Sequence, residues 1–146
     1  MLFLSKSSIK AAAERLSVLG EVYYQSLDAS DDAAVYAFAE NVYKHFGSID
    51  AWINNVGATV FKDGMEFTAS DVDKIVSYCF KPTLFGAQAA FRYMKEKGGA
   101  IVNLSSLAAR CPTAGRSTLY GPMKAAVNNL TQTLAGEYAA WNVRVN

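Results

Sequence analysis

A tyrosine and a lysine four residues apart are the side chains of this sequence best suited to proton transfer. In Tyr120-Gly121-Pro122-Met123-Lys124, a helical backbone would place the phenol and the ammonium on one face. A nearby ammonium stabilises a phenolate and lowers the pKa of a tyrosine from about 10 toward the range of a general acid or base. Pro122 fits only the first turn of a helix, which puts Tyr120 at the helix entry. The same spacing also arises by chance in surface pairs, so its meaning depends on context.

Two serines follow the apolar run that ends at Leu104. If this run is a strand of a parallel sheet, Ser105 and Ser106 lie at its carboxyl end, where open α/β sheets bind ligands. A serine hydroxyl in that position can donate a hydrogen bond to a substrate oxygen. The alternative is that both hydroxyls only satisfy neighbouring backbone groups after the strand.

A second strand end carries the segment Asn54-Asn55-Val56-Gly57. Asparagine side chains can bridge adjacent strands by hydrogen bonds. A glycine without a side chain lets the backbone approach a flat ligand closely. The segment therefore predicts one wall of a ligand cleft, with a plain turn as the alternative.

Strands and helices alternate along the chain that positions these residues. The apolar patterns predict strands over 2–4, 22–27, 49–53, 100–104 and 143–145. They predict helices over 9–19, 70–97 and 118–140, and one that Ser30 or Asp31 caps and Gly47 ends. The alternation favours parallel pairing through right-handed crossovers, with helices on both faces of the sheet. The predicted fold class is a doubly wound, Rossmann-like α/β fold.

Together the motifs match the short-chain dehydrogenase/reductase family in order, spacing and setting, and the sequence resembles that family along its whole length. Residues 54–57 stand where the family has Asn-Asn-Ala-Gly, and Ser106 stands where it has its catalytic serine. Tyr120 and Lys124 match its Tyr-x-x-x-Lys pair. Asp28 matches the acidic residue beside the adenine ring, although by itself it is typical of a turn that ends a strand.

The resemblance implies an oxidoreductase that uses NAD or NADP and acts on a small alcohol or carbonyl substrate. Tyr120 would donate or accept the hydroxyl proton while hydride passes to or from the nicotinamide ring, and Ser106 would polarise the reacting oxygen. Lys124 would lower the tyrosine pKa and bind the nicotinamide ribose. The cofactor cleft would be lined by Tyr120, Lys124, Asp28, Asn54, Asn55, Val56 and Gly57.

The helix that family members use for a water-mediated proton relay departs from their pattern. Cys79 stands at the position of their asparagine, and we expect it to act as a small apolar residue without a catalytic role. The segments around 82–85, 55–60 and 105–110 look most like the dihydrodiol dehydrogenases of benzoate degradation. That narrower resemblance implies a cyclic cis-dihydrodiol as substrate.

The choice between NAD and NADP stays open. In the family, an acidic residue after the second strand favours NAD, whereas a basic residue favours the phosphate of NADP. Ser5-Lys6 stands at that position and leans toward NADP, while the dihydrodiol resemblance implies NAD. A solvated lysine is the alternative interpretation of Lys6.

The sequence contains no glycine-rich turn of the kind that binds a cofactor pyrophosphate. We therefore interpret 1–146 as a single partial Rossmann-like domain, truncated at both ends and drawn from a longer enzyme, with a degenerate gene product as the rival. The family's first strand is central in its sheet. Its absence would leave the edges of strands 2–4 and 49–53 unpaired, or force them together.

Composition limits the partners that can be expected. Fourteen basic and thirteen acidic side chains leave a net charge of +1, which favours neither nucleic acid nor an anionic membrane. Two cysteines are too few for a disulfide framework or a zinc cluster, so no metal is expected and a reduced cytoplasmic protein fits best. No stretch predicts a membrane span or a targeting segment.

The two long predicted helices, 70–97 and 118–140, carry wide apolar surfaces. In similar enzymes these helices build dimer or tetramer interfaces, so we expect a homo-oligomer. The apolar residues concerned are Phe80, Leu84, Phe85, Phe91, Val127, Leu130 and Leu134.

Two other functions compete with the enzyme hypothesis. One is a non-catalytic relic of the fold that associates with a full-length homologue, and the other is a nucleotide-sensing regulator. The complete set of Ser106, Tyr120 and Lys124 favours the enzyme, whereas the missing glycine-rich turn favours the alternatives.

Overall fold

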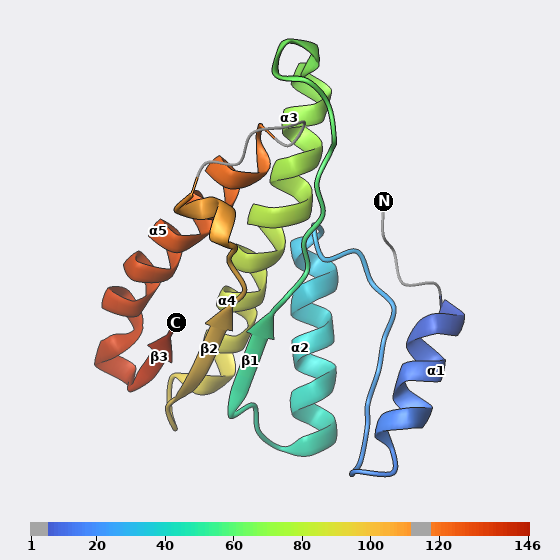
Figure 1. Cartoon of the computed structure of the whole chain (residues 1–146). Helices are drawn as coiled ribbons and strands as arrows, with labels where there is room; N and C mark the ends of the chain where they lie inside the picture. The colour runs from blue at the N-terminus through green and yellow to red at the C-terminus, as the bar shows by residue number, and fades with distance from the viewer. Residues whose placement is uncertain (1–5, 112–117) are drawn as a thin grey trace.

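Three short parallel strands form the sheet in the described part of this protein. The computed structural model describes residues 6–111 and 118–146. The strands are β1 (Ala51–Asn54), β2 (Gly99–Asn103) and β3 (Val143–Val145), in the order β1-β2-β3 (Figure 1). The register places Asn54 directly opposite Asn103, so the carboxyl ends of β1 and β2 are level. The predicted parallel α/β fold class is confirmed.

Five α-helices connect and flank the strands in the described ranges. They are α1 (Lys6–Leu16), α2 (Asp32–Phe46), α3 (Ala69–Ile75), α4 (Lys81–Met94) and α5 (Tyr120–Tyr138). The shorter helical turns are η1 (Gly64–Glu66), η2 (Val76–Phe80), η3 (Leu107–Ala109) and η4 (Ala139–Trp141). Because η2 is π-helical, the long helix predicted over 70–97 is interrupted by one wide turn between α3 and α4.

Local hydrogen bonds fix where α2 begins and ends. The Asp31 carboxylate accepts a hydrogen bond of 3.2 Å from the amide of Ala34, so Asp31 rather than Ser30 is the N-cap. Gly47 ends the helix with a φ of 79°, and its amide donates to the Tyr43 carbonyl at 2.8 Å. Both boundaries follow the predicted pattern.

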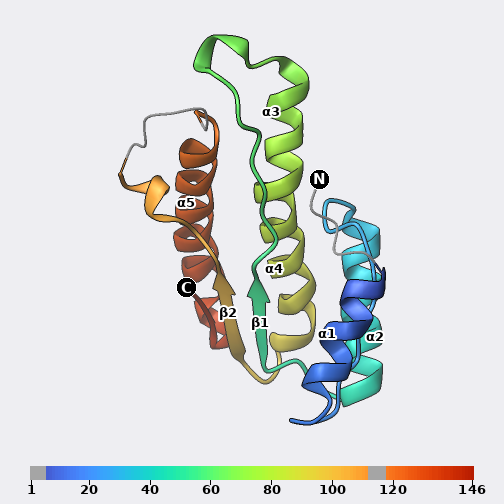
Figure 2. The same ribbon diagram turned by 45° about the vertical axis from the view of Figure 1, so that its right-hand side comes forward.

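Helices cover only one face of the sheet in the described part of the chain. α4 packs against β1 and β2, α5 packs against β3, and α2 lies against α4 (Figure 2). The covered face buries Ile101 completely, whereas Ile53 and Val102 on the opposite face are 66% and 39% exposed. The sequence predicted helices on both faces. α1 does not cover the second face of the sheet. It lies beside residues 21–28, on their far side from α2 and away from the sheet (Figure 1).

The strand predicted over 22–27 is wrong. This segment has no strand partner among the described residues, and it packs on α2 instead, where Tyr23 stacks on Phe38 with ring centroids 6.2 Å apart. A strand needs a neighbouring backbone to pair with, and the described residues offer none at this position. The strand predicted over 2–4 lies outside the described residues. Among the described residues β1 pairs on one side only, which agrees with the unpaired edge that the sequence predicts for strand 49–53.

The core lies between α4, α5 and the covered face of the sheet. Small residues on α4, Ala87 and Ala90, are fully buried and allow the helix to approach the sheet closely. Phe91 of α4 stacks on Tyr138 of α5 with ring centroids 3.9 Å apart. Burial of the Tyr138 phenol raises its pKa, since the charged form would lose hydration.

Part of the apolar surface predicted for self-association lies in this core. Val127 and Leu134 are buried. Phe85, Phe91 and Leu130 are half-buried against the core. The surface left for a partner is therefore smaller than the sequence indicated. None of the helices in the described ranges is long and apolar enough to cross a membrane.

Candidate active site

The ammonium group of Lys124 lies at the carboxyl ends of β1 and β2. Lys124 is 4% exposed, and its Nζ donates a hydrogen bond of 2.7 Å to the carbonyl of Leu104, just after β2. Nζ also lies 5.9 Å from the centroid of the Tyr120 ring. A Cβ built on Gly57, after β1, would lie 3.4 Å from it. The structure thus brings Gly57 next to Tyr120 and Lys124, which follow it by more than sixty positions in the sequence.

The electrostatics of this arrangement follow from the partner of Lys124. The ion pairs formed by residues 6–111 and 118–146 do not include Lys124, and its hydrogen-bond acceptor is a neutral carbonyl. A buried ammonium that is not neutralised by a carboxylate interacts strongly with any anionic or polar group brought beside it. Its charge is therefore available to Tyr120 or to a ligand.

The two serines after β2 have different partners. Ser106 is the N-cap of η3, and its Oγ accepts a hydrogen bond of 3.2 Å from the amide of Ala108. That bond does not use the hydroxyl hydrogen of Ser106, which stays available to a ligand oxygen. Ser105 instead donates from its Oγ to the backbone carbonyl of Lys124 at 3.2 Å.

Close contact between η3 and the start of α5 brings Ser106 toward Tyr120. A Cβ built on Gly121 would lie 2.7 Å from the carbonyl oxygen of Ala108. Only glycine allows this approach, because any side chain would overlap the turn. Gly121, which the sequence offered only as a spacer in Tyr-x-x-x-Lys, therefore has a packing role.

Asn54 lies behind the site, in a buried network of amides. Its Nδ2 donates to Asn103 Oδ1 at 2.8 Å and to the Thr83 carbonyl at 3.2 Å, while its Oδ1 accepts from Trp52 Nε1 at 2.8 Å. Asn103 Nδ2 in turn donates to Thr131 Oγ1 of α5 at 3.0 Å. Asn54 thus bridges adjacent strands, as expected of an asparagine there.

The next three residues, Asn55, Val56 and Gly57, are exposed. They continue beyond the end of β1 and form the part of this segment that a ligand can reach. A lining role for this segment would therefore fall to these three residues, with Asn54 holding the strand ends in place.

Asp28 forms the turn before α2. Its Oδ1 accepts hydrogen bonds of 2.8 Å from both the amide and the hydroxyl of Ser30. The carboxylate is exposed, and α2 begins at the end of the molecule at which β1 and β2 finish (Figure 1). The turn role is thus present, and contact with an adenine ring stays a prediction. Ser5, which entered the choice between NAD and NADP, lies outside the described residues.

Cys79 is fully buried in the π-helical turn η2. Its thiol donates a weak hydrogen bond of 3.1 Å to the carbonyl of Ala58, and its own carbonyl accepts from Thr83 Oγ1 at 3.0 Å. The residue packs as the small buried group expected from the sequence. Its contact with the segment after Gly57 was not anticipated.

A carboxylate that the sequence analysis missed holds the loop after Gly57. Asp71 of α3 is 3% exposed, and its Oδ2 accepts from Lys62 Nζ at 2.7 Å and from the amide and hydroxyl of Thr68 at 3.0 and 2.8 Å. The Lys62 hydrogen bond, with those from Thr68, holds the pKa of this carboxyl well below its usual range. The spacing Thr68-x-x-Asp71, a capping box, was the available signal.

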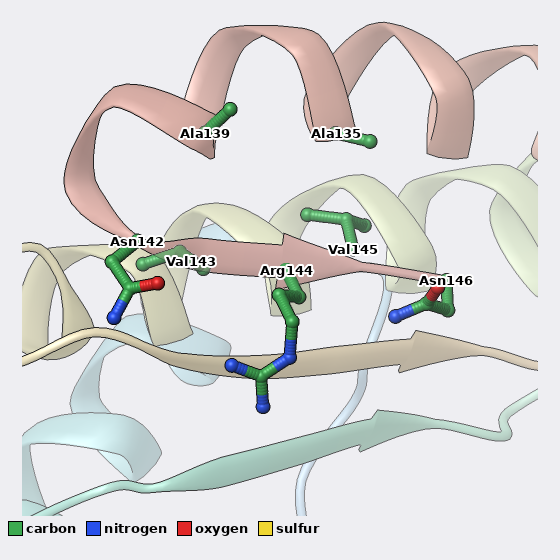
Figure 3. Close-up of a pocket in the computed structure, with 7 residues that line it drawn as sticks. All are labelled: Ala135, Ala139, Asn142, Val143, Arg144, Val145 and Asn146. Carbon is green, nitrogen blue, oxygen red and sulfur yellow. The ribbon is translucent and has the colours of Figure 1, made fainter.

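A pocket of about 320 Å³ lies elsewhere, beside β3 (Figure 3). It is lined by Ala135, Ala139, Asn142, Val143, Arg144, Val145 and Asn146. Val145 points toward α5, whereas Arg144 points away from it (Figure 3). The pocket contains none of the predicted site residues. No cluster of three or more potential metal ligands occurs within 6–111 and 118–146.

A parallel α/β fold that gathers Ser106, Tyr120 and Lys124 at the carboxyl ends of its strands defines a Rossmann-like class of protein. The chain matches the short chain dehydrogenase family over residues 2–146, and it belongs to that family. This is a family of oxidoreductases, which generally use NAD or NADP.

Individual relatives agree with this assignment. The chain is 32% identical to levodione reductase of Leifsonia aquatica over 139 residues, which cover 94% of this chain and 52% of that protein. It is 35% identical to 1,6-dihydroxycyclohexa-2,4-diene-1-carboxylate dehydrogenase of Pseudomonas putida over 140 residues, which cover 94% and 51%. The chain thus spans about half the length of these curated relatives.

The structure gives the same result. It superposes on a crystal structure of a short chain dehydrogenase from Mycobacterium smegmatis with a TM-score of 0.91 and 25% identity. The match covers 97% of this chain and 60% of that protein. The described elements therefore keep the arrangement that they have within a longer enzyme of the family.

Proposed function

We propose that this chain is one partial domain, 1–146, of an NAD(P)-dependent oxidoreductase that moves a hydride between the cofactor and an alcohol or carbonyl substrate. The observation that supports this most strongly is the buried Lys124 ammonium, 5.9 Å from the Tyr120 ring and next to Gly57. Such an arrangement suits a tyrosine that exchanges a proton with a substrate oxygen beside a bound ribose.

Each of the three catalytic residues has a distinct task in this proposal. The Tyr120 hydroxyl gives a proton to the substrate oxygen, or removes one from it, according to the direction of the reaction. The Ser106 hydroxyl donates a hydrogen bond to the same oxygen, using the hydrogen that its bond with Ala108 leaves free. The Lys124 ammonium stabilises the negative charge that develops on the phenol oxygen. The nicotinamide, when bound, supplies or accepts the hydride.

The residues around Lys124 fit the ribose end of a dinucleotide. A side chain at position 57 would fill the space beside the ammonium, so the glycine keeps that space open. Exposed Asn55 and Val56 extend this wall beyond β1. Asp28, at the start of α2, would contact the adenine end. Either NAD or NADP agrees with these residues.

The substrate that we propose is a cyclic cis-dihydrodiol. The support is the 35% identity to a Pseudomonas putida dehydrogenase whose name specifies a dihydroxylated cyclohexadiene carboxylate. Two exposed apolar side chains next to the site suit the face of such a ring: Leu107, which follows Ser106 and is 75% exposed, and Val56, which is 54% exposed.

We further propose that the complete protein is a homo-oligomer that associates through α4 and α5, and that it resides in the cytoplasm. The half-buried Leu84 of α4, which is not among the residues packed against the core, supports the first proposal. Two free thiols, those of Cys79 and Cys111, support the second, because a reducing compartment preserves them.

The test is turnover of NAD(P)H or NAD(P) with a panel of cyclic ketones, alcohols and cis-dihydrodiols. We expect Tyr120→Phe to abolish turnover, since it removes the exchangeable proton and keeps the ring. Tyr24→Phe is the matched control, because Tyr24 is a surface tyrosine, and it should keep the wild-type rate. Equal rates in wild-type protein and Tyr120→Phe would contradict the proposal. Absence of turnover together with tight association with a full-length homologue would favour the non-catalytic relic.

A further inference from the structure

Two consecutive residues after β2 contact Lys124, one at its ammonium group and the other at its backbone. The carbonyl of Leu104 accepts the hydrogen bond from Lys124 Nζ at 2.7 Å. The hydroxyl of Ser105 donates to the backbone carbonyl of Lys124 at 3.2 Å. We propose that Ser105 is a positioning residue, which sets the place of the Lys124 ammonium by fixing its backbone. This inference rests on the role proposed for Lys124.

The backbone of Leu104 and Ser105 is itself held in place by hydrogen bonds. The Leu104 amide donates to the Asn54 carbonyl at 2.9 Å, so residue 104 is tied to the end of β1 as well as to β2. Asn54 in turn is held by its buried amide network. A hydroxyl carried on this fixed backbone determines how far the first turns of α5 lie from the sheet.

The geometry separates Ser105 from its neighbour. Ser106 accepts a hydrogen bond from the amide of Ala108 within η3, whereas no hydrogen bond joins its hydroxyl to the described residues of α5. Ser105 faces α5 and contacts the residue that carries the ammonium. Lys124 is 4% exposed, so a small displacement of its backbone moves Nζ away from the Leu104 carbonyl, which is its hydrogen-bond acceptor within the described residues. Loss of the Ser105 hydroxyl should therefore loosen the ammonium.

Hydrogen exchange of the Lys124 ammonium, followed by 1H–15N NMR of the lysine side chains, tests this without any need for turnover. A buried, hydrogen-bonded ammonium exchanges its hydrogens slowly, and Lys124→Arg identifies the Lys124 signal by its loss. We expect Ser105→Ala to accelerate exchange about 2- to 10-fold, the range set by one net hydrogen bond. Ser105→Thr, which keeps a hydroxyl, should restore slow exchange.

Thr133→Ala is the matched control. The Thr133 hydroxyl also donates to a carbonyl of α5, that of Asn129 at 3.1 Å, but it is exposed and lies far from Lys124 along the helix. This variant should keep the wild-type exchange rate. Unchanged exchange in Ser105→Ala, or equal acceleration in Ser105→Ala and Thr133→Ala, would overturn the positioning role.

The outcomes for Ser105 and for the enzyme proposal can be told apart. Accelerated exchange in Ser105→Ala, in a protein that shows no turnover, would support the positioning role and count against the enzyme. Turnover that depends on Tyr120, with exchange unchanged in Ser105→Ala, would support the enzyme and overturn the positioning role of Ser105. If both hold, Ser105→Ala should raise the KM for the cofactor more than it lowers kcat, since Lys124 is proposed to bind the ribose.

Discussion

Gly86 of α4 lies directly against the side chain of Asn54. A Cβ built on Gly86 would overlap Asn54 Oδ1 and would come within 2.8 Å of Trp52 Nε1. The absence of a side chain at this position is what lets α4 cover the amide network at the end of β1. The network and the helix that covers it therefore depend on one glycine.

We predict that Gly86→Ala destabilises the protein by roughly 1 to 3 kcal/mol, because the added methyl group must displace a buried amide that holds three hydrogen bonds. Gly136→Ala in α5 is the control, since a Cβ there meets nothing within 4 Å. It should stabilise by up to about 1 kcal/mol through helix propensity. Urea denaturation of both variants measures the difference. Equal stability of the two variants would contradict the described packing.

The Asp71 cluster predicts how stability depends on pH. In the folded protein the pKa of this carboxyl lies below its usual value of 3.8, so its contribution to stability is fully present only above about pH 5, where the carboxyl is also ionised in the unfolded chain. The contribution is lost as the pH falls below about 5 and through the folded-state pKa. We expect Asp71→Asn to lose stability less steeply than the wild type between pH 5 and about pH 3.

The control for this prediction is Asp73→Asn, at an exposed carboxylate two residues further along α3. It should keep the wild-type pH dependence in a series of urea midpoints. If Asp71→Asn and the wild type lose stability in parallel, Asp71 is not the linked group.

The two faces of the sheet predict different losses of stability when their isoleucines are substituted. Ile101 is completely buried, so Ile101→Ala should cost about 2 to 5 kcal/mol. Ile53 is 66% exposed on the other face, so Ile53→Lys should change the free energy of unfolding by only about 0.5 kcal/mol. The same charge should reduce nonspecific aggregation measured by light scattering, because it interrupts an exposed apolar surface on the face opposite α4 and α5. A loss of several kcal/mol in Ile53→Lys would show that this face is covered in solution.

The apolar patterns of the sequence correctly predicted the strands that have a neighbouring strand to pair with in the described structure. The strands predicted over 49–53, 100–104 and 143–145 form one sheet as β1, β2 and β3, with β2 paired to both neighbours, and their buried residues also pack on α4 and α5. The segment 22–27 has the same local pattern, but it forms no strand in the described structure. Strand formation depends on a neighbour as much as on local composition, which periodicity does not report.

The residues of the candidate site could be predicted from the sequence, but their individual contacts could not. The motifs pointed to Lys124, Tyr120 and both serines, yet only the structure distinguishes the bond from Ser105 to α5 from the bond that Ser106 makes within η3. The strand-bridging role expected of Asn54 is present in its buried side-chain network, whereas its contact with a cofactor stays a prediction. Neighbouring side chains of the same type can point in different directions, because tertiary contacts determine the orientation of each.

The most direct test of the central proposal is titration of this chain with NADH and NADPH, followed by cofactor fluorescence. We predict saturable binding of at least one cofactor, weakened about tenfold or more in Lys124→Met, because a hydrogen bond to a charged group contributes about 1.5 to 3 kcal/mol. Lys44→Met should bind as the wild type does, since Lys44 lies on the surface and pairs with Glu40. Absence of saturable binding, or equal affinity in Lys124→Met and the wild type, would contradict a cofactor site at Lys124.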